Sequence, residues 1–263
     1  MPTKSHPEPS SLSFDDYKSV LELLSTDDAR PLIVIGGQAV NFWAQRYLSQ
    51  RPALEQLQPF TSHDIDVLGH IDDAYRAAAE PNVELETPKK GSATPVIANL
   101  YITTGKTIRM VQFLRHMAGV SNDELLKFAV RFEFKNRAYH IADPIALLAA
   151  KVYNLVSLTQ RGRNDEKHFE MLNVCVPTFL ARQVHAVEKA EGPAKTLLQH
   201  FERVLSISLS SSGRKLARTR PVRWSTFLPL RQLQNSGNTQ LQRFAEMRMA
   251  RWAEGLIKKG LTP

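Results

Sequence analysis

Cysteine is almost absent from the chain, and so are long apolar runs. The 263 residues include one cysteine, Cys175, which excludes an internal disulfide or a Cys-x-x-Cys zinc or redox pair and favours a reducing, cytoplasmic location. No apolar run approaches the roughly 20 residues that a membrane span needs. Residues 1–13 are rich in proline and serine and lack the apolar stretch of a secretory signal. We expect this segment to be disordered and the protein to have no membrane partner.

Positive charge is concentrated in the second half of the chain. Residues 1–140 carry 15 lysines and arginines against 17 aspartates and glutamates, and the totals of 34 and 26 leave 19 against 9 for residues 141–263. A basic half indicates either a surface that meets a polyanion, with nucleic acid the first candidate, or simply a need for solubility. The 43% hydrophobic content supplies material for one large core or two modest ones.

Hydrophobic periodicity changes near residue 142, close to the change in charge balance. Before it, short β-branched and alternating segments separate helical ones; beyond it, apolar residues recur at helical spacing almost to the end. We predict an α/β (α+β) fold, with a mixed sheet flanked by helices in residues 14–142 and a basic helical domain in residues 143–263. Strands are expected at 32–35, 63–69, 82–87, 95–103, 106–114, 130–134 and 138–141, and a helix at 14–24.

Two glycines at the end of one strand and two aspartates on a later strand form the chemically informative pattern. The apolar run LIVI leads into Gly36-Gly37 and then into a helical period. A diglycine there lets the backbone approach a phosphate and present a helix N-terminus to it. In HDIDVLG, Asp64 and Asp66 share one strand face, and such carboxylates suit Mg²⁺ held against substrate phosphates. Each element also occurs without a ligand, as a plain turn or a solvated strand face.

Together and in this order, IGGQAVNFW and TSHDIDVL resemble the signature of the DNA polymerase β-like nucleotidyltransferase superfamily. They look most like its AbiEii-type bacterial members, several of which are toxins of toxin–antitoxin pairs. The resemblance covers about residues 30–170 and implies a nucleotidyltransferase-type sheet. ADPIALLAAKVYNLVSL is similar to a family helix that carries a lysine, here Lys151. In RGRNDEKHFEML, Arg163 and Asp165 match a later family motif, with His168 where its second aspartate is usual.

The resemblance implies an enzyme that moves a nucleoside monophosphate from an NTP to an acceptor hydroxyl and depends on Mg²⁺ or Mn²⁺. RNA, for example tRNA, or a protein would be the acceptor, and an antitoxin protein is an implied partner. Gly36 and Gly37 would hold the triphosphate, and Lys151 would neutralise phosphate charge. Asp64 and Asp66 would be the catalytic residues and metal ligands.

Two departures from the family pattern concern the acids. Active members supply a third carboxylate on a later strand, whereas IRMVQFL has Gln112 at that position. An amide coordinates metals weakly and cannot act as a general base. Glu133 in RFEF, or Glu84 or Glu86 in NVELET, are open substitutes. The second departure is the 26 residues between the second glycine and the first aspartate, more than the signature usually allows, which makes RPALEQLQPF an inserted loop.

The segment 213–224 is the most basic part of the chain. Its cationic side chains could grip an RNA backbone while the indole stacks on a base. The same composition fits a solvated linker or a docking surface for an acidic partner such as an antitoxin. The residues concerned are Arg214, Lys215, Arg218, Arg220, Arg223 and Trp224.

Three functions therefore remain open at this stage. The first is the nucleotidyltransferase. The second is a catalytically weakened protein of the same fold, which binds nucleotide, RNA or a protein partner without turnover, and Gln112 is its main support. The third is a nucleic-acid-binding regulator in which the basic half alone makes the contacts.

Overall fold

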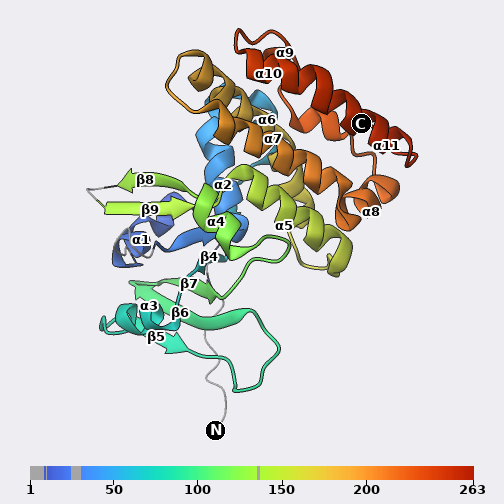
Figure 1. The fold of residues 1–263 in the computed structure, drawn as a ribbon. Coiled ribbons are helices and arrows are strands. Elements are labelled where there is room, and N and C mark those ends of the chain that lie inside the picture. Colours follow the sequence, from blue (N-terminus) through green and yellow to red (C-terminus); the bar gives the residue numbers. More distant parts are fainter. Residues whose placement is uncertain (1–8, 10, 25–30, 135–136) are drawn as a thin grey trace. The chain divides into compact units, whose positions relative to one another are not determined.

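The computed structural model describes residues 9, 11–24, 31–134 and 137–263, and the chain forms two compact units (Figure 1). The first unit contains residues 1–46 and 58–147, and the second contains 47–57 and 148–263. The boundary predicted at residue 142 therefore shifts to lie between Leu147 and Leu148, inside a helix. The segment 47–57, which includes most of the inserted loop predicted at 51–60, belongs to the second unit.

A seven-stranded mixed sheet forms the centre of the first unit and confirms the predicted α/β class. Strand β4 is antiparallel to β2 and parallel to β7, while β2 is parallel to β9. The remaining neighbours are antiparallel. In sheet order the strands are β5 (Val83–Glu86), β6 (Val96–Thr104), β7 (Thr107–Leu114), β4 (Asp64–Leu68), β2 (Ile33–Ile35), β9 (Arg137–Ile141) and β8 (Val130–Phe134).

Each of the seven predicted strands is present, with ends within one residue of the prediction. Residues 135 and 136, which connect the last two strands, lie outside the described residues. Successive side chains of β4 point to opposite faces of the sheet. Ile65 and Val67 are fully buried on one face, and Asp64 and Asp66 are half-buried on the other. The two faces of the sheet thus differ in chemistry along this strand.

Helices flank the sheet, and two of them were not predicted. The predicted helix at 14–24 forms as a short 3-10 turn followed by α1. Ser13 donates both its backbone N–H and its hydroxyl to Asp16 Oδ2 in the first turn. Helix α3 packs against β5 and β6. The elements are 3-10 helix η1 (Asp15–Tyr17) and helices α1 (Lys18–Leu24), α2 (Gly36–Tyr47), α3 (Ile71–Ala77) and α4 (Asn122–Phe128).

Part of the predicted disordered N-terminus is ordered. Leu12–Ser13 forms a short strand, β1, which pairs with β3 (Thr61–Ser62), directly before the strand that carries the two aspartates. The Ser11 hydroxyl donates a hydrogen bond to Thr61 Oγ1 at 3.0 Å. The remainder of the prediction, at residues 1–8 and 10, lies outside the described residues.

The second unit is helical, as predicted, and contains the inserted segment. Arg51 Nε donates to Thr178 Oγ1 on α6 at 2.8 Å, which ties that segment to the longest helix of the unit. Helix α6 continues through Pro177, although a proline normally ends a helix. The elements are η2 (Leu48–Gln50), η3 (Pro52–Leu57), α5 (Pro144–Ser157), α6 (Asp165–Glu188), α7 (Ala194–Leu209), α8 (Ser211–Thr219), η4 (Trp224–Phe227), α9 (Leu230–Gln234), α10 (Thr239–Arg243), the π-helix η5 (Phe244–Met249) and α11 (Ala250–Ile257).

Candidate functional site

The glycine turn and the aspartate strand lie side by side, although 26 residues separate them in the sequence. Ile35, the last residue of β2, pairs with Asp66 in the antiparallel β2–β4 ladder. Gly36 follows at once and opens α2 with φ +69°, a conformation that glycine adopts readily. A Cβ atom on Gly36 would overlap Asp66 Oδ2 and lie 2.7 Å from its Cγ. The carboxylate therefore rests against the first residue of the helix.

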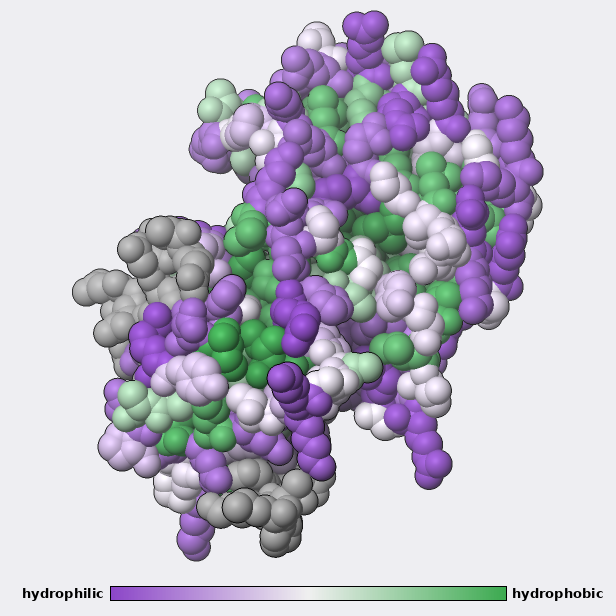
Figure 2. All heavy atoms as spheres, turned by 60° about the horizontal axis from the view of Figure 1, so that its bottom comes forward, coloured by the Kyte–Doolittle hydropathy of each residue, from purple (hydrophilic) through white to green (hydrophobic). Residues whose placement is uncertain are grey.

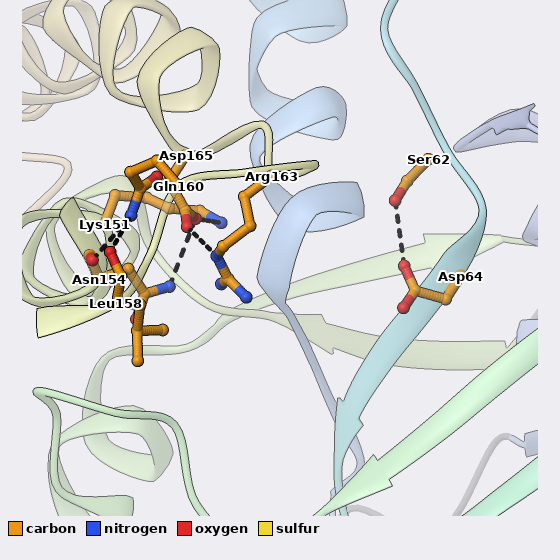
Figure 3. Close-up of polar contacts among 8 residues, drawn as sticks. All are labelled: Ser62, Asp64, Lys151, Asn154, Leu158, Gln160, Arg163 and Asp165. Carbon is orange, nitrogen blue, oxygen red and sulfur yellow. Dashed lines mark hydrogen bonds and ion pairs between the residues drawn. The ribbon is translucent and has the colours of Figure 1, made fainter.

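Asp64, the other aspartate of the pair, has its own set of neighbours. The Ser62 hydroxyl donates a hydrogen bond to Asp64 Oδ1 at 3.1 Å (Figure 3). Tyr17 is fully buried, and its hydroxyl has no hydrogen-bond partner within the described part of the chain. Burial, and then the negative charge of Asp64, raise the pKa of Tyr17. The aspartate pair is thus flanked by a phenol that stays neutral at physiological pH.

Gln112 lies beside Asp66, where the sequence analysis placed the missing third acid. The two residues are register partners in the parallel β4–β7 pair, so their side chains share one face of the sheet. On the other side of Gln112 its register partner is Asn99 on β6, whose own partner is Glu86 on β5. A row of polar side chains therefore crosses four strands, ending at Asp66.

The other candidates for a third acid lie too far from the aspartates to share a metal ion with them. Glu86 and Glu84 are on β5, three strands from β4, which corresponds to roughly 14 Å at normal strand spacing. Glu133 on β8 is also three strands away, in the other direction, and its carboxylate pairs with Arg131 at 2.5 Å. Gln112 is thus the side chain that β7 places next to Asp66.

The donor set at this site fits a magnesium ion that is completed by a substrate. Among the described residues, no group of three histidine, cysteine, aspartate or glutamate side chains could hold a metal alone. Mg²⁺ is commonly held by one or two carboxylates together with substrate phosphates. Asp64 and Asp66 supply hard oxygen donors on one strand face, and the space that a side chain at Gly36 would fill is taken by the Asp66 carboxylate.

Lys151, the predicted phosphate ligand, belongs to a buried polar cluster in the second unit. It is 7% exposed, and its Nζ lies 2.8 Å from Asp165 Oδ1. Arg163 Nε lies 2.6 Å from the other oxygen of Asp165, and Asn154 Nδ2 donates to Oδ1 at 3.3 Å (Figure 3). Burial alone would raise the pKa of Asp165, but these partners outweigh it and lower the pKa to about 2. The charge of Lys151 is therefore already matched by a carboxylate.

Two further titratable groups of the second unit, His168 and Cys175, are buried. His168, on α6, is 6% exposed, and its Nδ1 has no hydrogen-bond partner among the described residues. Burial, followed by the positive charge of Lys151, lowers the pKa of His168 to about 3. Burial also raises the pKa of the Cys175 thiol to about 12. Both groups are neutral at physiological pH, which suits a structural role.

The basic segment 213–224 is mostly a helix and not the predicted connection. Leu216 is buried, whereas Lys215 and Arg218 are exposed and Arg214 is half-buried, so α8 presents a cationic outward face. Trp224 is fully buried, which contradicts the expectation that its indole could stack on a base. The last two cations of the segment differ: Arg220 pairs with Glu166, and Arg223 is exposed.

Sequence reasoning identified Asp64, Asp66 and Gln112 but missed the neighbours that surround them. Asn99 stands between two buried apolar residues of β6, and a single polar residue in an alternating strand is the signal that could have drawn attention to it. Tyr17 and Ser62 gave no such signal, because an aromatic residue in a helical segment and a hydroxyl residue beside a strand are common in proteins of any function.

The surface and the comparisons with known proteins add little about function. Hydrophilic side chains cover much of the face in Figure 2, with apolar residues showing between them, and no described helix has both the length and the apolar character of a membrane span. No protein family and no curated protein matches the chain. Among solved structures, it is similar to an antigenic nucleotidyltransferase-like protein from Paracoccidioides brasiliensis, at 14% identity and a TM-score of 0.39, over 63% of this chain and 78% of that one.

Proposed function

We propose that the first unit binds a nucleoside triphosphate at Gly36-Gly37 and the Asp64–Asp66 pair and transfers its nucleoside monophosphate to an acceptor hydroxyl, with pyrophosphate as the leaving group. The observation that carries the proposal is the contact between the Asp66 carboxylate and Gly36. It unites a helix N-terminus, which favours phosphate, with carboxylates, which favour a divalent cation. Neither element alone requires a ligand, but their juxtaposition suits a metal-bound polyphosphate.

Each residue of the site has a defined task in this reaction. The backbone of Gly36 and Gly37 approaches the phosphates, and the N–H groups of the first turn of α2 face their negative charge. Asp64 and Asp66 hold Mg²⁺, which when bound stabilises the attacking and leaving oxygens of the transfer. Ser62 orients the Asp64 carboxylate through its hydrogen bond. Phosphoryl chemistry asks the protein mainly for such positioning and charge neutralisation.

The first test is transfer of label from each α-³²P NTP to total RNA or to protein, in the presence of Mg²⁺. We expect the double variant Asp64→Asn/Asp66→Asn to lose at least about a hundredfold of the activity, because it removes the charge of both ligands. The matched control is Asp72→Asn/Asp123→Asn, which removes the same charge from exposed positions in the same unit. Equal activity of the wild type and the first variant would refute the assignment.

A second candidate function is nucleotide binding without transfer, and Gln112 favours it. A neutral amide beside Asp66 leaves the site without a third carboxylate to take the proton of the acceptor hydroxyl. In this case, equilibrium dialysis should show Mg²⁺-dependent NTP binding by the wild type and loss of that binding in the Asp64→Asn/Asp66→Asn variant. The wild type should transfer no label.

RNA is the acceptor that we propose, because α8 presents its cations outward. Arg214 and Arg218 lie on the side of the helix opposite Leu216, and Lys215 is exposed at its flank, where its Nζ also donates to Val156 O at 3.3 Å. Such a group of cations favours phosphate groups. Arg223, beyond the end of the helix, is exposed as well, whereas Arg220 pairs with Glu166. A protein hydroxyl is the other possible acceptor, and the labelling experiment separates the two because labelled RNA and labelled protein differ in nuclease sensitivity.

A further inference from the structure

A hydrogen-bonded relay leads from Gln112 to the edge of the sheet. Gln112 Nε2 donates to Asn99 Oδ1 at 3.2 Å, and Asn99 Nδ2 donates to Glu86 Oε2 at 3.5 Å. Tyr101 also donates its hydroxyl to Glu86 Oε2, at 3.1 Å. All four residues lie on the face of the sheet that carries the aspartates, because their register partners run straight across β5, β6, β7 and β4.

The direction of this relay is fixed by the carboxylate at its outer end. An ionised carboxylate only accepts hydrogen bonds, so Glu86 takes the Nδ2 side of the Asn99 amide. The Oδ1 of Asn99 is then the atom that faces Gln112, and an oxygen there requires the Nε2 of Gln112. The carbonyl oxygen of Gln112 is left over, directed away from Asn99, and it has no hydrogen-bond partner among the described residues.

We infer that Asn99 and Glu86 are positioning residues, which hold the Gln112 amide so that its carbonyl oxygen serves as a neutral third ligand to a divalent cation on the Asp64–Asp66 pair. This inference rests on the proposed function of the aspartates. The site would thus use an oriented amide oxygen where a third carboxylate is expected. A freely rotating amide would have to be ordered by the cation itself, whereas the hydrogen bond from Gln112 Nε2 to Asn99 already holds the amide in one orientation.

The test compares Mn²⁺ binding by the 263-residue chain and by its variants. The EPR signal of the free ion measures how much Mn²⁺ remains unbound. Breaking the relay with Asn99→Leu should weaken Mn²⁺ binding about tenfold, the usual effect of losing a residue that orients a metal ligand. The double variant Asn99→Asp/Glu86→Gln exchanges donor and acceptor at the outer end but still offers an oxygen to Gln112 Nε2. It should bind Mn²⁺ within about twofold of the wild type.

A second readout follows the amide directly and needs no metal. In ¹⁵N NMR spectra, the side-chain NH₂ pair of Gln112, assigned by its disappearance in Gln112→Leu, should show slow exchange in the wild type and in Asn99→Asp/Glu86→Gln. The same pair should lose this protection in Asn99→Leu. If Asn99 served folding alone, Asn99→Leu would lower the thermal stability of the protein, and the exchanged pair Asn99→Asp/Glu86→Gln would not restore it.

The outcomes separate this inference from the proposed function. If Asn99→Leu binds Mn²⁺ as the wild type does, while Asp64→Asn/Asp66→Asn does not bind it, the aspartate site stands and the relay is refuted. If the exchanged pair fails to restore binding although it folds, the relay is refuted as well. If the wild type does not bind Mn²⁺ without nucleotide, the inference is overturned, whereas the proposed function, in which substrate phosphates complete the metal site, is decided by the labelling experiment. If the aspartate variant binds Mn²⁺ as well as the wild type does, both proposals are overturned.

Discussion

The carboxylate of Asp66 occupies the space that a Cβ atom on Gly36 would need. This relationship joins the end of β2 to the middle of the sheet, and it makes the glycine necessary for two reasons at once. The backbone conformation there, φ +69°, disfavours any side chain, and the neighbouring carboxylate excludes it.

Gly36→Ala is expected to destabilise the protein by about 2–4 kcal/mol, because backbone strain of about 1–3 kcal/mol adds to the displacement of Asp66. The control is Gly105→Ala, at φ +60° with open space around it, which introduces similar strain without the collision. Urea denaturation measures both. A loss of stability no greater in Gly36→Ala than in the control would mean that Asp66 moves aside freely.

Lys151→Met should destabilise the second unit by about 3–5 kcal/mol, because it leaves the buried Asp165 carboxylate with Arg163 as its remaining cation. Lys195→Met, at an exposed position of α7, removes the same charge and should change the free energy of unfolding by less than about 0.5 kcal/mol. Thermal denaturation of both variants at pH 7 gives the comparison. Similar melting temperatures for the two would show that the ion pair contributes no net stability.

His168 should make the protein sensitive to mild acid. Its pKa is about 3 in the folded protein and about 6.5 in an unfolded chain, so the unfolded chain binds the proton more tightly. Stability is therefore complete above pH 6.5 and declines as the pH falls from 6.5 towards 3, by on the order of 4 kcal/mol. Unfolding free energies of the wild type and His168→Gln across this range test the prediction, and parallel curves would contradict it.

The cationic face of α8 should control the salt dependence of RNA binding. Neutralising Arg214, Lys215 and Arg218 to glutamine removes up to three phosphate contacts and should reduce the slope of log K against log salt by about 2 for single-stranded RNA. Filter binding between 50 and about 200 mM salt measures it. The matched control removes three exposed charges from the end of the chain, in Arg251→Gln/Lys258→Gln/Lys259→Gln. An equal change of slope in both triple variants would exclude a specific role for α8.

Strand positions followed from the sequence because alternation and β-branched residues determine them locally. The face shared by Asp64 and Asp66 was predictable for the same reason. The continuity of α6 was not, because a proline normally ends a helix. At Pro177, the buried neighbours Cys175 and Phe179 hold the helix in place on both sides, and this tertiary packing outweighs the local preference.

The contact between Gly36 and Asp66 was beyond the reach of sequence patterns. It depends on the antiparallel register of β2 and β4 across an insertion, and no local periodicity encodes a register between distant strands. The helix α8 was missed for a different reason. Its serine cap, Ser210, and its single buried leucine, Leu216, are weak signals in a segment dominated by charge.

Residues 47–57 belong to the second unit although the residues on both sides of them belong to the first. This arrangement affects how the chain can evolve and be engineered. A single cleavage between Leu147 and Leu148 would leave a fragment of the helical unit attached to the sheet unit. The helical unit therefore cannot be moved to another protein as one uninterrupted stretch of coding sequence. Recombination that exchanges it has to replace two separate segments, and we expect the two units to have been inherited together.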